Sequence, residues 1–113
     1  MHSRRSFTGA LLGFSASQSL PAAAADPAWM GIAEGGGLLR RKKLSPIEWT
    51  KACLDRIEKL NPRLNAFITV TAEQALADAR RMESELQAGK VRGPLHGVPI
   101  ALKDLIDTTG IRT

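Results

Sequence analysis

A near-continuous apolar run close to the end of the chain, Val98-Pro99-Ile100-Ala101-Leu102, constrains the fold more than any other feature. A run of this kind suits a β-strand that is covered on both faces, as in a sheet flanked by helices. Pro99 has no backbone N–H to offer a neighbouring strand, so it must lie at the start of the strand or at a sheet edge. Residues 98–102 therefore predict an α/β fold.

A helix is predicted over residues 46–60. Ser45-Pro46-Ile47-Glu48 forms a capping box with proline at the first helical position, and Leu44 and Trp49 have the spacing of a hydrophobic staple. Asn61-Pro62 is expected to end the helix, because the residue before a proline avoids helical geometry. Apolar residues recur at helical spacing between these limits, so one face of the helix must be buried.

A second strand and a second helix are predicted to follow. Every second residue between Leu64 and Val70 is apolar, which predicts a strand over residues 64–70. Thr71-Ala72-Glu73-Gln74 offers a second capping box, and Gly89 supplies a helix stop. Apolar positions between these signals predict an amphipathic helix. Both strands would belong to a larger mixed sheet.

The segment from Pro27 to Arg41 is predicted to form only a weak or broken helix. Gly35-Gly36-Gly37 lies in the middle of its apolar pattern. Three glycines in succession cost a helix roughly 3 kcal/mol relative to alanine.

Residues 1–25 have the pattern of an export signal. A basic start, Ser3-Arg4-Arg5-Ser6-Phe7, precedes a mildly apolar segment, and Ala23 and Ala25 then fit an A-x-A cleavage site. Ser-Arg-Arg-x-Phe resembles the twin-arginine signal of bacteria, which implies that the export machinery reads Arg4 and Arg5 and that the product is periplasmic or secreted. Residues 26–113 would form the mature part, in which no apolar segment is long enough to span a membrane.

Composition narrows the function. Aromatic residues make up 4% of the chain and Tyr is absent, so a base-stacking nucleic-acid surface is not expected. The net charge is +5, and its densest basic run, Arg40-Arg41-Lys42-Lys43, predicts a solvated connection, with an anion-binding patch as the alternative. The single Cys53 excludes an internal disulfide and predicts a small packed hydrophobe. His96 has no second ligand at metal spacing, which predicts a partly exposed turn histidine, with contact to the substrate near the strand entry as the alternative.

Lys103 is the candidate catalytic residue, because it follows the apolar run directly. Burial at the end of a strand would lower the pKa of a lysine, since the charged form loses hydration. A lysine of this kind can take a proton from a hydroxyl group and so activate a serine. The alternative is a structural ion pair with Asp104, Asp107 or a carboxylate elsewhere.

The stretch from Gly93 to Asp104, Gly-Pro-Leu-His-Gly-Val-Pro-Ile-Ala-Leu-Lys-Asp, resembles the N-terminal signature of the amidase signature family. Leu44-Ser45-Pro46 and the residues from Leu60 to Phe67 are similar to that family's first helix and first strand. Asp107 to Thr113 resembles the loop that follows the family's lysine. The resemblance implies the N-terminal part of the amidase signature fold.

This resemblance also implies a mechanism. Members of the family hydrolyse amide bonds, or transfer the released ammonia, with a Ser–cis-Ser–Lys triad. Lys103 would be the general base, acting through a bridging serine on a nucleophilic serine that forms an acyl-enzyme. A small-molecule amide would be the substrate, and no metal or organic cofactor is implied.

The two serines of the triad are missing, because no Gly-Ser-Ser-Gly run is present and the remaining serines lie in the leader or at helices. The chain is therefore expected to be an N-terminal fragment without amidase activity of its own. The favoured interpretation of the complete protein is an exported amidase. The leader argues against the alternative, the family's glutamyl-tRNA amidotransferase A-type subunit, which is cytoplasmic. Two further interpretations are a small basic non-catalytic binding protein and a chain that does not fold stably alone. The substrate and the oligomeric state stay open.

Overall fold

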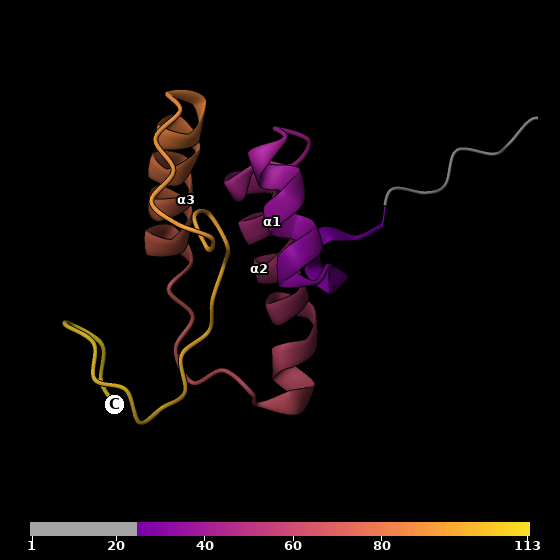
Figure 1. The fold of residues 1–113 in the computed structure, drawn as a ribbon. Helices are drawn as coiled ribbons and strands as arrows, with labels where there is room; N and C mark the ends of the chain where they lie inside the picture. Colours follow the sequence, from indigo (N-terminus) through magenta and orange to yellow (C-terminus); the bar gives the residue numbers. More distant parts are fainter. Residues whose placement is uncertain (1–24) are drawn as a thin grey trace, which may run out of the picture.

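The computed structural model describes residues 25–113, and the predicted export signal, with Arg4 and Arg5, lies outside this range except for Ala25. The elements of the described part are a short 3₁₀ turn, η1 (Pro27–Trp29), and three helices, α1 (Ile32–Arg40), α2 (Pro46–Leu64) and α3 (Ala72–Gln87). The long helix α2 contacts both α3 and η1. After α3 the chain turns back along that helix and then runs past the ends of the helices as a loop (Figure 1).

The start of α2 confirms the predicted capping box. The backbone N–H of Glu48 donates to Ser45 Oγ at 3.1 Å, and the backbone N–H of Ser45 donates to Glu48 Oε2 at 2.9 Å. Leu44 and Trp49 are both buried in the same apolar cluster, as a hydrophobic staple requires. The capping box and the hydrophobic staple together therefore fix the residue at which α2 begins.

The predicted end of this helix at Asn61-Pro62 is wrong, because α2 continues through Pro62 to Leu64. A proline removes one helical hydrogen bond, and the last turn of a helix tolerates that loss better than its interior does. Asn65 then ends the helix in the left-handed conformation at φ 49°, and its N–H donates to the Asn61 carbonyl at 2.8 Å. The stop is thus made by Asn65, a residue type that adopts this conformation readily.

The prediction of a broken helix around the three glycines is also wrong. Helix α1 is continuous from Ile32 to Arg40. Gly35 lies directly against the buried indole of Trp49, and a β-carbon at position 35 would come within 2.5 Å of Cζ3 and 2.6 Å of Cζ2 of that ring. Packing on α2 therefore offsets the low helix propensity of glycine, and the lack of a side chain is what allows the close approach.

Helix α3 confirms the predicted amphipathic helix, but not its N-terminal capping box. Thr71 stands at the N-cap and its side chain makes no capping hydrogen bond. The C-terminal stop is as predicted: Gly89 has φ +75°, with its N–H donating to Leu86 O at 3.1 Å and the N–H of Lys90 donating to Glu85 O at 2.8 Å. This pair of bonds is the Schellman arrangement.

A small apolar cluster holds the three helices together. Leu39, Leu44, Trp49 and Leu86 form it, and Cys53 packs against it, as predicted for a small hydrophobe. The basic run at residues 40–43 is exposed in the turn between α1 and α2, which confirms a solvated connection. Its alternative role as an anion-binding patch stays a prediction.

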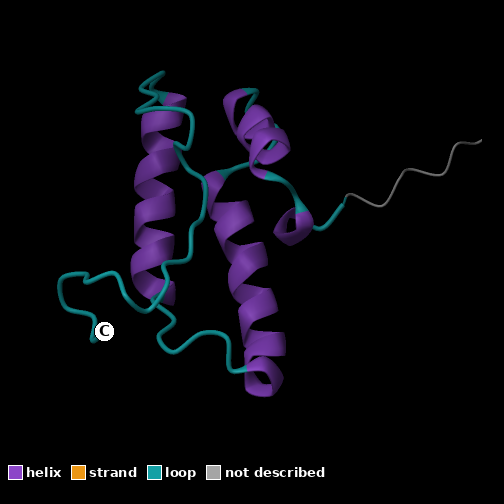
Figure 2. Cartoon of the chain, turned by 60° about the horizontal axis from the view of Figure 1, so that its bottom comes forward, coloured by secondary structure: helices purple, strands orange, loops and turns teal. Residues whose placement is uncertain are grey.

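The predicted strands at 64–70 and 98–102 are wrong for this structure, because the described residues 25–113 contain no β-strand (Figure 2). Leu64 belongs to α2, and the remaining residues of both segments lie in loops. A strand needs a neighbour to take up its backbone hydrogen bonds, and none of the described segments supplies one. Residues 65–70 and 100–102 are instead exposed, with Ile68 77% and Ile100 73% accessible. The α/β fold of the prediction is therefore replaced here by three helices and a long loop.

Candidate functional site

The residues of the family-like stretch begin with a turn that is seated on the helices. Two successive backbone hydrogen bonds form it, from His96 N–H to Gly93 O and from Val98 N–H to Leu95 O, both at 3.1 Å. Gly97 has φ +78°, and a β-carbon there would come within 2.9 Å of Pro46 Cγ. A glycine is thus needed at position 97 for two reasons, backbone conformation and close contact with the start of α2.

His96 is buried in this turn, with 9% of its surface exposed, so the predicted partly exposed ring is wrong. Its Nε2 lies 2.8 Å from the Met82 carbonyl oxygen of α3. Its Nδ1 accepts the backbone N–H of Arg92 at 3.2 Å. Both ring nitrogens are therefore paired, which is the usual condition for burying an imidazole.

An ion pair links the same loop to α3. Arg92 Nε donates to Glu85 Oε2 at 2.6 Å, and Arg92 Nη2 donates to Glu85 Oε1. The hydrogen bond from Arg92 lowers the pKa of Glu85, and the same bond raises the pKa of Arg92. A two-pronged pair of this geometry fixes the direction of the loop as well as its distance from the helix.

Lys103 lies in the turn that follows the extended segment. Its carbonyl accepts the backbone N–H groups of Leu105 at 2.8 Å and Ile106 at 3.2 Å. The expected buried strand before it is absent, and Leu102 is 54% exposed. Lys103 is exposed as well. Its catalytic role stays a prediction.

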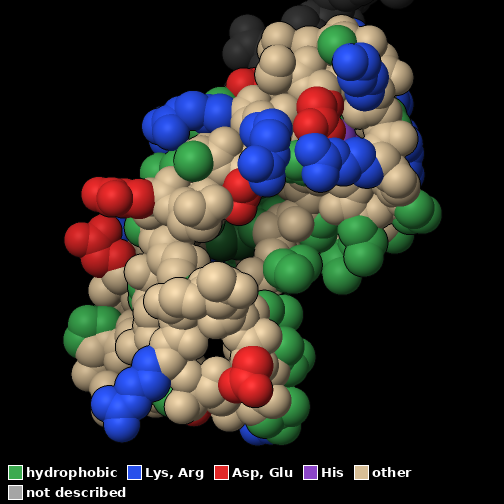
Figure 3. Space-filling view, turned by 90° about the vertical axis from the view of Figure 1, so that its left-hand side faces the viewer, with side chains coloured by type: hydrophobic (Ala, Val, Ile, Leu, Met, Phe, Trp, Pro, Cys, Tyr) green, Lys and Arg blue, Asp and Glu red, His purple; other side chains and the backbone are tan. Residues whose placement is uncertain are grey.

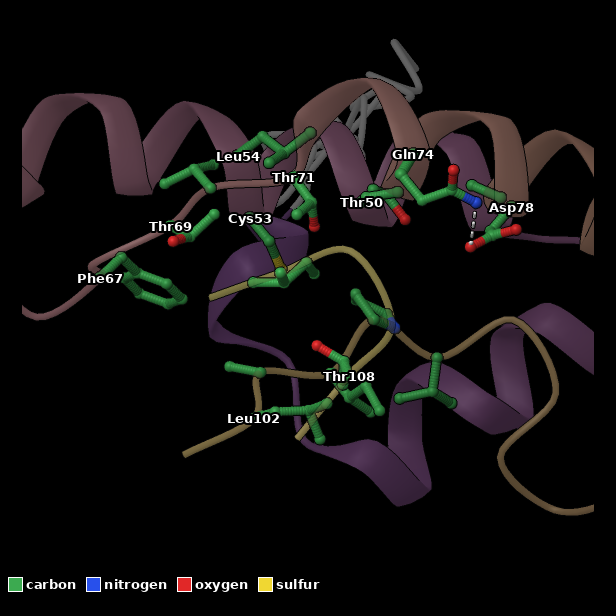
Figure 4. Close-up of a pocket in the computed structure, with 18 of the residues that line it drawn as sticks. Thr50, Cys53, Leu54, Phe67, Thr69, Thr71, Gln74, Asp78, Leu102 and Thr108 are labelled. Carbon is green, nitrogen blue, oxygen red and sulfur yellow. Dashed lines mark hydrogen bonds between the residues drawn. The ribbon is translucent and has the colours of Figure 1, made fainter. Parts of the chain in front are cut away.

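A groove of about 1060 Å³ lies between α2, α3 and the C-terminal loop, and Lys103 is one of the residues that line it. In the close-up, Thr50, Cys53 and Leu54 from α2 face Leu102 and Thr108 from the C-terminal loop (Figure 4). The space-filling view shows a hollow with apolar side chains at its edge and Lys and Arg side chains gathered to one side (Figure 3). The groove thus offers an apolar wall with a lysine on its lining.

Two polar side chains on the groove wall, Gln74 and Asp78, are paired. Gln74 Nε2 donates to Asp78 Oδ2 at 3.1 Å, and Arg81 Nη2 donates to Asp78 Oδ1 at 2.7 Å. The described serines, Ser45 and Ser84, are not among the groove residues. Within residues 25–113 no three side chains are grouped so that they could hold a metal ion.

Cys53 is the one thiol on the groove wall. Burial raises its pKa, and the carboxylate of Asp26 raises it further. A thiol in such surroundings is less nucleophilic than a free cysteine, because the thiolate is the reactive form. The surroundings of Cys53 therefore do not activate its thiol as a nucleophile.

The sequence located the turn and the lysine, but it did not indicate the contacts that hold the turn. Opposite charges at Glu85 and Arg92 flank the helix stop at Gly89, and this was a readable signal for the ion pair. The burial of His96 had no such signal, because its two partners are backbone groups of Met82 and Arg92.

Comparison with known proteins gives a consistent result. A family model described as Amidase matches residues 48–113. Three similar proteins are each named as the A-type subunit of glutamyl-tRNA(Gln) amidotransferase. The protein from Dehalococcoides mccartyi is 51% identical over 82 residues, 73% of this chain and 17% of its own length. The protein from Geobacter metallireducens is 52% identical over 75 residues, which are 66% of this chain and 15% of its own length. The protein from Desulfosudis oleivorans is 43% identical over 88 residues, which are 78% of this chain and 18% of its own length.

The chain thus spans less than a fifth of the length of these relatives, at 15–18%. No solved structure matches the chain. A search of the described helices for one long and apolar enough to cross a membrane finds none.

Proposed function

This chain belongs to the amidase family, and we propose that it contributes Lys103 to an active site that removes ammonia from an amide. The observation that carries the proposal is the position of Lys103. It falls inside the matched residues 48–113, in a stretch with the family's signature pattern, and it lines the groove between α2, α3 and the C-terminal loop. The relatives' names favour the A-type subunit of glutamyl-tRNA(Gln) amidotransferase for the whole protein.

Lys103 would act as general base. Its neutral amine takes a proton from a bridging serine, which in turn takes the proton of the serine that attacks the amide carbonyl. The carbonyl carbon then forms a bond to the serine oxygen. The proton passes back from Lys103 through the bridging serine to the leaving nitrogen, so ammonia departs as the amide C–N bond breaks, and water then cleaves the acyl-serine ester that remains. A lysine acts as a base only through its neutral amine, and the proposal requires that the groove close over Lys103 in the complete site.

The serines of such a site must come from residues other than those that the structure describes. Ser45 caps α2 through its hydroxyl, and Ser84 lies on the exposed side of α3. The Ser45 hydroxyl is already used in the helix cap, and neither serine lines the groove that contains Lys103. The 113-residue chain is therefore expected to release no ammonia from small carboxamides. Turnover by this chain that Lys103→Ala abolishes would refute this.

A hybrid amidase tests the role of Lys103 directly. In the hybrid, residues 26–113 replace the segment of the Dehalococcoides mccartyi relative that aligns with them, and ammonia release from small carboxamides is measured. Lys103→Ala should lower kcat by about 10²–10⁴-fold, the usual contribution of a general base. Lys90→Ala is the matched control, because Lys90 is exposed and does not line the groove. Equal activity of the Lys103→Ala hybrid and its parent contradicts the proposal.

An exported amidase acting on small amides is the second candidate. The leader pattern Ser3-Arg4-Arg5-Ser6-Phe7 favours it, because an export signal would carry the enzyme out of the cytoplasm, away from tRNA. Residues 1–25 fused to a reporter should direct it to the bacterial periplasm, and replacing Arg4 and Arg5 together by lysine should stop this. A reporter that stays in the cytoplasm with the natural leader removes this candidate.

A further inference from the structure

His96 bridges two backbone groups that belong to different parts of the chain. Its Nδ1 lies 3.2 Å from the Arg92 backbone nitrogen, and its Nε2 lies 2.8 Å from the Met82 carbonyl oxygen. A backbone N–H can only donate, so Nδ1 must be the acceptor and must carry no proton. Nε2 therefore carries the proton and donates it to the carbonyl, and the bridge needs the neutral ring in this one tautomer.

The bridge holds the start of the segment that carries Lys103. Gly97, next to His96, is fixed against Pro46, and Val98 packs on the apolar cluster. Beyond Val98 the chain loses these supports, because Ile100 is 73% exposed and Lys103 itself is exposed. The turn is thus the anchored end of a segment whose far end bears the lysine.

We propose that His96 is a positioning residue for Lys103, and that its bridge sets the direction in which residues 98–103 leave the helices. The inference rests on the role proposed above for Lys103. A small change of angle at an anchored turn moves a group several residues away by more than the tolerance of proton transfer. His96 acts on that placement through the backbone and touches no reacting atom.

Protonation of the ring breaks one half of the bridge. An imidazolium carries a proton on both nitrogens, so Nδ1 can no longer accept from Arg92. The charged groups that face the turn are Glu85 on α3, its partner Arg92 on the loop, and Arg40 of α1, whose guanidinium and the Pro94 carbonyl both lie beside Gly36.

Two variants separate the contacts of the bridge. The Oδ1 of an asparagine takes the place of Nδ1, so His96→Asn keeps an acceptor for Arg92 and loses the donor to Met82. The amide of a glutamine reaches as far as Nε2, so His96→Gln keeps the donor to Met82 and loses the acceptor for Arg92. His96→Leu fills similar space and loses both contacts, which leaves the Arg92 backbone N–H without its partner, while the Met82 carbonyl keeps its helical hydrogen bond within α3.

Nuclear magnetic resonance of the full 113-residue chain tests the bridge itself. The ring nitrogens should show the neutral Nε2–H form, and the Arg92 amide proton should exchange with solvent about tenfold faster in His96→Gln and His96→Leu than in His96→Asn. The amide shifts of residues 98–103 should change most in His96→Leu. A proton on Nδ1, or equal Arg92 exchange in all variants, overturns the inference.

The hybrid amidase tests the consequence for Lys103. His96→Leu should lower kcat by about tenfold or more with KM unchanged, and His96→Asn should recover part of the loss. Arg56→Ala is the control, because it removes the contacts of Arg56 with Asp26 and Trp29, which do not line the groove, and should lower thermal stability while leaving kcat unchanged. If Lys103→Ala abolishes activity and His96→Leu does not reduce it, the inference alone fails. If Lys103→Ala leaves activity intact, the proposed function and the inference both fail.

Discussion

Replacing Gly35 by alanine is the sharpest test of how α1 packs on α2. On helix propensity alone, Gly35→Ala should stabilise α1 by about 1 kcal/mol. The structure predicts the opposite sign, because the new β-carbon would lie 2.5 Å from Cζ3 and 2.6 Å from Cζ2 of Trp49. Carbon atoms in contact normally lie about 3.5–4.0 Å apart, so the ring or the helix must shift by about 1 Å or more.

The size of the effect follows from these two opposing contributions. Trp49 is 4% exposed, so its ring has little free space into which to move. Overpacking of a buried contact costs about 1–3 kcal/mol, and the propensity gain offsets about 1 kcal/mol of it. We expect a net loss of up to about 2 kcal/mol in the free energy of unfolding. For a domain of this size that lowers Tm by up to about 16 °C.

Gly37→Ala is the matched control on the same helix. Its β-carbon would meet only the flexible guanidinium of Arg41, at 3.5 Å from Nη1, so the propensity gain should dominate and raise stability. Urea unfolding followed by circular dichroism measures both variants without relying on the fluorescence of Trp49. In a Trp49→Phe background the penalty of Gly35→Ala should shrink, since the smaller ring leaves room. An unchanged penalty there, or a stabilising Gly35→Ala, refutes the packing argument.

Two further predictions concern helix ends and pH. Ser45→Ala should cost about 1 kcal/mol in the free energy of unfolding, and Thr71→Ala should stay within about 0.5 kcal/mol, because only Ser45 makes a side-chain cap; equal losses in urea unfolding would contradict this. Hydrogen bonding from Arg92 lowers the pKa of Glu85, so the stabilisation by this pair is complete above the unfolded glutamate pKa of about 4.3 and is lost as pH falls through the lower folded value. Glu85→Gln should therefore flatten the fall of Tm below that pH, and Glu83→Gln should not.

Helix starts and stops were the most predictable part of the fold, because they depend on neighbours in sequence. Ser45 and Glu48 cap α2 within three residues of each other, and Gly89 closes α3 with bonds to the preceding turn. Thr71 shows the limit of such patterns, since the residues of a capping box are present and its hydrogen bond is not. Local chemistry allows a cap, and the backbone angle at the cap residue decides whether it forms.

The three glycines of α1 show why other features could not be predicted. Their cost to a helix is local, but what compensates it is the indole of Trp49, fourteen residues after Gly35. In the candidate site, the same reasoning applies to His96, whose partner in α3 lies fourteen residues before it. Neither pairing leaves a periodic pattern, because each joins one side chain to a particular place on another element.

The two strand predictions fail for a different physical reason, and it bears on the function. Residues 98–102 have the composition of a strand covered on both faces, yet the structure leaves Ile100 and Leu102 exposed beside the groove. An exposed apolar surface of this kind is costly in water and is stable only when something covers it. The apolar composition of residues 98–102 therefore suits a strand with covering elements on both faces, and residues 25–113 do not supply those elements. Covering this segment would also remove water from around Lys103, and the same event that satisfies the apolar run would lower the cost of a neutral amine. The unmet strand pattern and the exposed lysine are thus two consequences of one uncovered surface.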